Sequence, residues 1–200
     1  MIILAINYMD ITTDETLLYF FKKGDKNAFK VLFEKYYPPL HAYGVKISND
    51  PSITEDCLQS FFIYLFEKRK KLDDIKNLKS YFFISFKRAL LKNIKECSRI
   101  STLDEYELMQ RNFVFSVEET NIIQEVDFLC TKTLHHLLND LAPREREVVY
   151  FKYYVGLNTI DISEVMEISG QSVLNTLQKA MIKLRKEAEN QMISNILKKY

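Results

Sequence analysis

Residues 143–187 read PREREVVYFKYYVGLNTIDISEVMEISGQSVLNTLQKAMIKLRKE and predict three short helices. Pro143 suits the first turn of a helix, because a backbone N–H at that position would have no partner within the helix. Apolar residues at helical spacing follow it, at Val148, Val149, Phe151 and Val155. Gly156 is expected to end this first helix, since glycine adopts the left-handed backbone of a helix C-terminus without strain.

Polar residues indicate where the next two helices begin. Asn158 or Thr159 is suited to cap the second helix, whose expected inner face is Ile160, Ile162, Val165 and Met166. Residues 168–170 predict a tight turn, and Ser172 is then expected to cap the third helix. The predicted buried stripe of the third helix is Val173, Leu177, Ala180, Met181 and Leu184.

Two helices joined by a short turn form a helix-turn-helix unit, in which the second helix enters the major groove of DNA. The exposed face of the third helix would carry the candidate DNA-binding residues Gln171, Ser172, Asn175, Gln178 and Lys179. Glutamine and asparagine side chains can each pair with adenine through two hydrogen bonds, and lysine binds phosphate. A plain three-helix bundle without a role in DNA binding has the same pattern and stays open as an alternative.

Residues 138–185 resemble the fourth conserved region of the bacterial extracytoplasmic-function (ECF) sigma factors. The matching positions are Ala142 and Pro143 with Arg146, Asp161 to Ser163, Ile168 and Ser169, Ser172 and Val173, Lys179 to Met181, and Leu184 and Arg185. The resemblance implies that the third helix reads the −35 element of a promoter. It also implies core RNA polymerase and promoter DNA as partners, together with an anti-sigma factor.

The first half of the chain predicts further amphipathic helices. One follows Thr13, one spans residues 27–37, and a separate one is expected after Pro38 and Pro39 interrupt the pattern. The next begins at Ser52 or Thr54 and has one wide apolar stripe, formed by Leu58, Phe61, Phe62, Leu65 and Phe66. On physical grounds alone it is a core helix with a solvated polar side.

Residues 28–68 resemble the second conserved region of the same family, through Ala28 and Phe29, Leu32 and Phe33, Tyr36, and the run from Glu55 to Phe62. In the family this helix docks on the clamp helices of RNA polymerase. The resemblance therefore implies that Asp56, Gln59 and Phe62 bind polymerase.

Residues 78–98 predict one long helix that carries aromatic residues and a basic face, made by Lys87, Arg88, Lys92 and Lys95. Cations that follow phosphates and rings that stack on bases are typical of single-stranded DNA binding. The resemblance implies that this helix opens and reads the −10 element, although the family often has asparagine where Arg88 stands. A solvated basic face with no DNA contact is the alternative.

Composition favours an all-α protein, and the length allows one or two domains. The two resemblances imply helical domains at residues 1–100 and 128–200, and the charge bias of residues 101–127 predicts a flexible acidic linker between them. The linker holds seven acids and one base, whereas the whole chain has a formal net charge of +1. The three cysteines and three histidines lack the spacing of a disulfide framework or a metal site. We therefore expect no metal, cofactor or catalytic residue, and a protein that is not an enzyme.

The N-terminal nine residues are apolar but too short to span a bilayer, and no signal peptide is expected, so the sequence predicts a cytoplasmic protein. Met9 would serve as a start as well as Met1. The interpretation that fits both resemblances is a sigma factor that directs core polymerase to promoters.

Two other classes remain open. One is a helix-turn-helix regulator that acts without replacing a polymerase subunit. The other is a degenerate sigma-like adaptor with weak DNA readout, favoured by Leu174 and Thr176 where the family has basic residues. Glu167 in place of the usual turn glycine points the same way, and would cost about 1 kcal/mol if its φ is positive.

Overall fold

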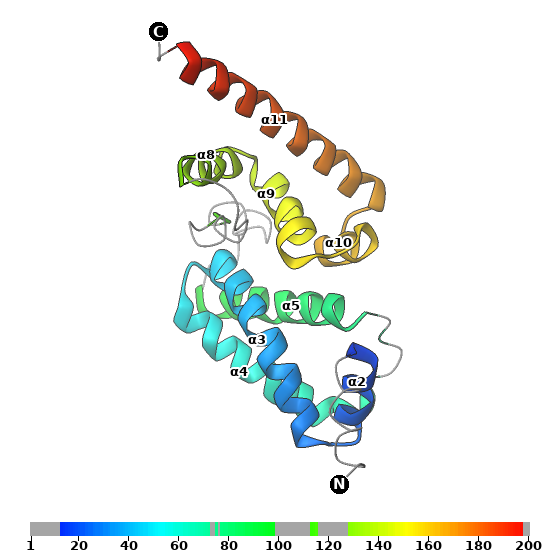
Figure 1. Cartoon of the computed structure of the whole chain (residues 1–200). Coiled ribbons are helices and arrows are strands. Elements are labelled where there is room, and N and C mark those ends of the chain that lie inside the picture. Colours follow the sequence, from blue (N-terminus) through cyan, green and yellow to red (C-terminus); the bar gives the residue numbers. More distant parts are fainter. Residues whose placement is uncertain (1–12, 73–74, 76, 99–112, 116–127, 198–200) are drawn as a thin grey trace. The chain divides into compact units, whose positions relative to one another are not determined.

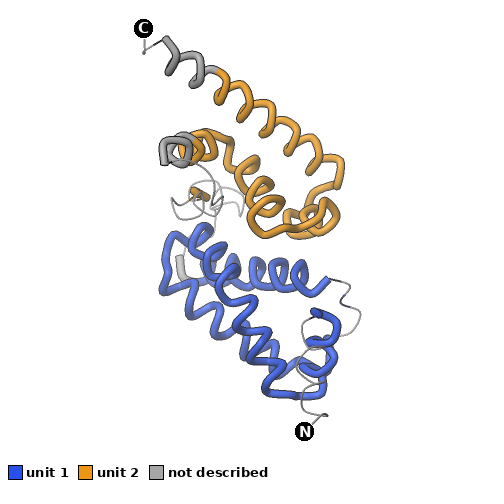
Figure 2. The backbone as a smooth tube through the Cα atoms, viewed as in Figure 1, with its two compact units in different colours: residues 1–103 blue, residues 104–200 orange. Residues whose placement is uncertain are grey.

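The computed structural model describes residues 13–72, 75, 77–98, 113–115 and 128–197, without the side chains of 97–98, 128–133 and 190–197. The chain divides into two compact units, residues 1–103 and 104–200 (Figure 2). Every regular element in the described ranges is a helix, which confirms the predicted all-α fold (Figure 1). None of the helices in these ranges is long and apolar enough to cross a membrane.

Unit 1 consists of α2 (Asp14–Lys22), α3 (Lys26–Ser48), α4 (Pro51–Lys68), the short 3₁₀ turn η1 (Arg69–Lys71) and α5 (Leu78–Ser98). The bounds of α5 are those that the sequence predicts. The core between α3, α4 and α5 is aromatic and contains Tyr36, Tyr43, Phe61, Phe82, Phe83 and Phe86. Burial and the hydrogen bond from its hydroxyl to Asp14 (2.7 Å) raise the pKa of Tyr36 well above its ordinary value.

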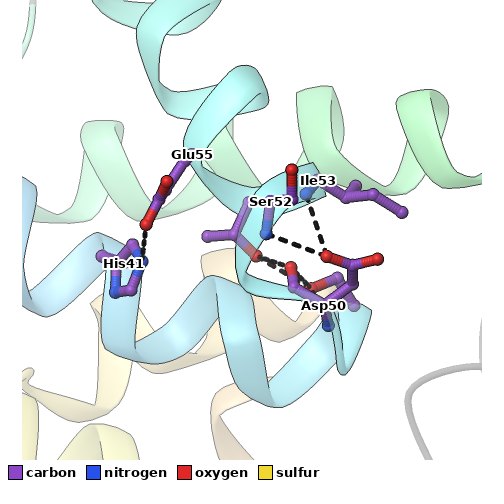
Figure 3. Close-up of polar contacts among 7 residues, drawn as sticks. His41, Asp50, Ser52, Ile53 and Glu55 are labelled. Carbon is purple, nitrogen blue, oxygen red and sulfur yellow. Dashed lines mark hydrogen bonds and ion pairs between the residues drawn. The ribbon is translucent and has the colours of Figure 1, made fainter.

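Side-chain caps begin the first three helices of unit 1. Thr13 accepts the N–H of Thr16 at α2, as predicted. At α4 the cap is Asp50 rather than Ser52 or Thr54, and its carboxylate accepts the N–H groups of Ser52 (2.8 Å) and Ile53 (3.3 Å; Figure 3). The cap moves upstream because Pro51 occupies the first turn of α4, where its missing N–H costs nothing.

The expectation that Pro38 and Pro39 separate two helices is wrong, because α3 runs through both. A proline inside a helix removes a hydrogen bond and crowds the preceding turn. The apolar stripe of α3 nevertheless continues on both sides of the prolines, with Leu32, Tyr36, Leu40, Tyr43 and Ile47 all buried. Burial of this continuous stripe offsets the local cost.

Helices α3, α4 and α5 approach one another at Gly44. A Cβ built there would lie 2.5 Å from Thr54 Cγ2 and 3.0 Å from the ring of Phe86. The missing side chain is therefore what permits this helix spacing.

Unit 2 consists of α8 (Phe128–Asn139), α9 (Pro143–Val149), the π-helical turn η2 (Tyr150–Val155), α10 (Thr159–Met166) and α11 (Gly170–Leu197). Gly156 has φ +78° and ends η2, as predicted. The start of α9 is tied to α11 through the buried Glu145. Its carboxylate accepts the N–H of Ala142 (3.0 Å) and lies 2.8 Å from Lys183 Nζ.

Two details of the predicted three-helix pattern are corrected. Ile160 is 69% exposed instead of buried, because it lies on the opposite side of α10 from Ile162 and Val165. The residue that caps α11 is Ser169, whose hydroxyl accepts the N–H of Ser172 (3.1 Å). The turn is therefore shorter than expected, and α11 begins before Ser172.

Candidate functional site

The outward face of α4 carries the first group of candidate residues. Asp56 and Gln59 are exposed and lie three residues apart, so they share one face of the helix. Phe62 is only 3% exposed and packs on Phe33 (ring centroids 4.8 Å apart) and Phe61. Its burial corrects the expected direct contact, because a core ring has almost no surface to offer a partner.

Ile63 completes this face of α4 and was not among the residues predicted from the sequence. It lies seven residues after Asp56 and four after Gln59, and it is 53% exposed. The missed signal is the position of Ile63 outside the apolar stripe of its own helix. Asp56, Gln59 and Ile63 are here called the α4 stripe. A single exposed apolar residue is ordinary on a protein surface, so Ile63 is of interest only through the face that it shares with Asp56 and Gln59.

The edge of α3 lies beside the α4 stripe. Tyr37 stacks on His41 (centroids 5.8 Å apart), and His41 Nε2 lies 3.5 Å from a carboxylate oxygen of Glu55 on α4 (Figure 3). Beneath the stripe, burial raises the pKa of the Cys57 thiol to about 11. The thiol is therefore protonated at neutral pH, which makes it a packing residue instead of a nucleophile.

The basic residues of α5 largely share one face. Arg88, Lys92 and Lys95 are exposed, whereas Lys87 is half-buried at the edge of that face. Lys92 pairs loosely with Glu96, at 3.8 Å. Exposed ion pairs of this kind contribute little to stability, so they do not hold these side chains away from a phosphate.

The aromatic residues of α5 do not join its basic face. Phe82, Phe83 and Phe86 are buried in the core of unit 1, which excludes the expected stacking of these rings on DNA bases. Tyr81 is the one ring of this helix that is partly exposed. The surface of α5 is therefore suited to phosphates more than to bases.

The N-terminal part of α11 forms the third group of candidate residues. Gln171, Asn175, Gln178 and Lys179 are exposed, and Ser172 is half-buried next to the cap. Gln171 Nε2 donates a hydrogen bond to Asn175 Oδ1 (2.9 Å), which orients the Asn175 amide. The Oδ1 atom has a second lone pair and Nδ2 has two N–H groups, so this amide can still pair with a base.

Glu167 ends α10 with φ +53° and ψ +45°, which confirms the positive φ that the sequence analysis considered for this position. Side chains in this region strain the backbone by roughly 1–2 kcal/mol, and glycine does not. Replacing Glu167 with glycine would relieve this strain, but part of the stability gained is lost because glycine raises the conformational entropy of the unfolded chain.

Glu167→Gly should accordingly stabilise unit 2 by about 0.5–1 kcal/mol, which thermal unfolding followed by circular dichroism would detect as a rise of a few degrees. Glu164→Gly, three residues earlier inside α10, is the matched control and should destabilise by about 1 kcal/mol. Equal losses of stability in Glu167→Gly and Glu164→Gly would contradict the backbone strain at Glu167.

Family models match both units of the chain. Sigma-70 region 2 matches residues 32–100, and Sigma-70, region 4 matches residues 131–184, so that together they cover more than half of the chain. No curated protein matches the chain in sequence. Among solved structures, the chain is similar to CnrH in complex with the cytosolic domain of CnrY, with a TM-score of 0.54 and 16% identity, over 88% of this chain and 97% of that one.

The chain therefore belongs to the sigma-70 family. Region 2 followed by region 4 is the combination typical of the ECF sigma factors, which confirms the resemblance read from the sequence. The protein is a sigma factor, which acts in transcription initiation by joining core RNA polymerase and recognising promoter DNA.

Proposed function

We propose that three surfaces of this sigma factor have separate binding roles. The α4 stripe binds core polymerase, the basic face of α5 binds the DNA backbone at the −10 element, and the start of α11 reads the −35 element. The observation that carries the proposal is that the candidates Asp56 and Gln59 share an exposed face with an apolar residue, Ile63. Together these residues offer a partner one charged, one amide and one apolar side chain on a single exposed helix face.

The direct test is run-off transcription with purified core polymerase on a library of promoters. The chain should start transcripts from a subset of sequences with a shared −35 and −10 pattern, and core polymerase alone should not. Protection of a palindromic site by the chain without polymerase would instead favour a helix-turn-helix regulator.

The −10 contact proposed for α5 is mainly electrostatic. Arg88, Lys92 and Lys95 supply three positive charges on one side of the helix, and Lys87 lies at its edge. Each phosphate neutralised releases bound counterions, so binding through this face should weaken steeply with salt. The burial of the phenylalanine rings supports a smaller share for base stacking than the sequence alone indicates.

Base readout at the −35 element is assigned to Asn175, which Gln171 orients. Asn175→Ala should relax the preference at one base position, because an asparagine paired with adenine contributes roughly 1–3 kcal/mol of discrimination. Lys179→Ala is the comparison. It should weaken binding to all sequences evenly and lower the slope of log affinity against log salt concentration by about one. Selection of bound sequences by the holoenzyme measures both effects, and an unaltered base profile with Asn175→Ala would contradict the assignment.

A degenerate adaptor with weak DNA readout is the second candidate, because Leu174 is half exposed on α11 and the Thr176 hydroxyl donates to the Ser172 carbonyl (2.7 Å). Neither residue supplies charge to DNA. If the wild-type holoenzyme selects no −35 sequence, this alternative replaces the readout proposal.

We further propose a cytoplasmic location and an anti-sigma partner. Three cysteines far apart in sequence, without the spacing of a disulfide framework, support the location. The fold shared with CnrH, whose structure contains the cytosolic domain of CnrY, supports the partner. Co-purification of the tagged chain from cells of its source would test for the partner.

A further inference from the structure

Leu174 is an apolar residue on the face of α11 that carries the candidate base-reading residues. Its side chain is 50% exposed, whereas Val173 and Ala180, on the buried side of the same helix, are 0% exposed. Leu174 therefore gives only part of its surface to the core of unit 2. A single exposed leucine is ordinary on a protein surface, and what distinguishes this one is its place on the helix.

Helical geometry places Leu174 at one edge of this face and Lys179 at the other. With about 100° of rotation per residue, Leu174 lies about 60° to one side of Gln171, and Lys179 lies about 80° to the other side. Asn175 and Gln178 lie between these two edges, and all five side chains are exposed. The face therefore runs from an apolar edge, through three amides, to a basic edge.

The major groove of DNA offers the apolar edge one suitable partner. Every base pair displays hydrogen-bond donors and acceptors there, but thymine alone adds a methyl group. A leucine side chain held against a phosphate would remove water from a charge without supplying a hydrogen bond, which is unfavourable. Burial of a thymine methyl group against leucine is favourable, because both surfaces are apolar.

The neighbouring amides restrict where this thymine can lie. Gln171 Nε2 donates a hydrogen bond to Asn175 Oδ1 (2.9 Å), so these two side chains form one polar unit beside Leu174. Leu174 and Asn175 are consecutive, and consecutive Cα atoms are about 3.8 Å apart, close to the spacing of about 3.4 Å between base pairs. The thymine that meets Leu174 therefore lies in the base pair that Asn175 reads or in a neighbouring one.

We propose that Leu174 is a specificity-determining residue of the −35 contact and selects a thymine through its methyl group. This assignment rests on the proposed function, in which the start of α11 enters the major groove at the −35 element. A basic residue at this position would strengthen binding to every sequence alike, because phosphates carry no sequence information. Leucine instead strengthens binding only where a methyl group is present.

Replacement of thymine by uracil tests the methyl group alone, since uracil keeps every hydrogen-bonding group of thymine. The −35 element is first selected with the wild-type holoenzyme, and each thymine on either strand is then replaced by uracil. The dissociation constant of the wild-type holoenzyme should rise about fourfold for one of these replacements, in or next to the base pair that Asn175 reads. The Leu174→Ala holoenzyme should bind the thymine and uracil promoters equally.

Ile182→Ala is the matched control. Ile182 is another apolar residue of α11, 54% exposed, but it lies about two turns further from the helix N-terminus, whose residues contact the bases in this docking mode. This variant should keep the wild-type sensitivity to uracil. Leu174→Ala should keep the wild-type helix content by circular dichroism, because leucine and alanine have similar helix propensities and Leu174 is half exposed.

Salt dependence gives a second readout that a purely structural role would not produce. The uracil effect should be the same at low and high salt, because a methyl contact releases no counterions. The effect of Lys179→Ala should instead shrink as the salt concentration rises. A uracil effect that disappears at high salt would contradict a methyl contact.

The outcomes separate this assignment from the proposed function. Equal sensitivity to uracil in the wild type and in Leu174→Ala, or no sensitivity at any thymine, would overturn the role of Leu174 and leave the proposed function intact. Weaker binding of Leu174→Ala to core polymerase in the absence of DNA would also overturn it, since the residue would then contact protein. A wild-type holoenzyme that selects no −35 sequence would refute the proposed −35 readout itself.

Discussion

Asp56→Arg combined with Gln59→Ala is expected to weaken binding to core polymerase by about 10–100-fold, or roughly 1.4–2.8 kcal/mol. Both residues lie on the exposed α4 stripe, so the loss comes from the interface and not from unfolding. Reversing a charge within an interface replaces an attraction with a repulsion and also slows association. Titration of labelled protein with core polymerase would measure the change.

Ile63→Ala should give a smaller loss by the same assay, since it removes apolar area without adding charge. Glu15→Arg is the matched control, because it makes the same change in charge at an exposed position of α2 and should leave the affinity nearly unchanged. Circular dichroism should show wild-type helix content for all three proteins. Wild-type affinity of the double variant would refute the role of the stripe.

Gly44→Ala is expected to destabilise unit 1 by about 1–3 kcal/mol, although alanine is the better residue for a helix. Helix propensity alone predicts that alanine would stabilise α3 by roughly 0.5–1 kcal/mol. The added Cβ, however, would lie 2.5 Å from Thr54 Cγ2 and 3.0 Å from the Phe86 ring, so the helices must move apart. Hydrogen exchange measured helix by helix in the full chain would locate the loss in α3, α4 and α5.

A second substitution tests the cause. Thr54→Ser removes the methyl group but keeps the hydroxyl, which bonds to the Asp50 carbonyl (3.0 Å) and the Ser48 hydroxyl (2.8 Å). The cost of Gly44→Ala should therefore be smaller in the Thr54→Ser background. Gly170→Ala, where a Cβ would meet nothing within 4 Å, is the control and should not destabilise. A stabilising Gly44→Ala would show that the helices adjust freely.

Local signals in the sequence predicted much of the fold. Helix α5 has the predicted bounds, Thr13 caps α2, and Gly156 ends η2 with a positive φ. Each of these depends on interactions within a few residues, which a sequence pattern contains. The positive φ at Glu167 also followed from the sequence, through the family position at which glycine is usual.

Most of the misses have a common physical origin, because they depend on contacts between distant segments. Ile160 is the exception, since helical spacing alone places it opposite Ile162 and Val165 on α10, and the burial of Phe62 agrees with its place in the predicted apolar stripe of its helix. The phenylalanines of α5 are in the core because the aromatic residues of α3 and α4 surround them. Pro38 and Pro39 stay within α3 for a similar reason.

The π turn at Tyr150–Val155 has a consequence for the register of the chain. A π turn holds one residue more than an α turn, and one residue corresponds to about 100° of rotation around a helix axis. Deleting a single residue here would restore an ordinary helix, but it would also rotate the buried Val155, at the end of the turn, by about 100° relative to α9. The burial of Val155 thus depends on an irregularity in helix winding as much as on its place in the apolar pattern.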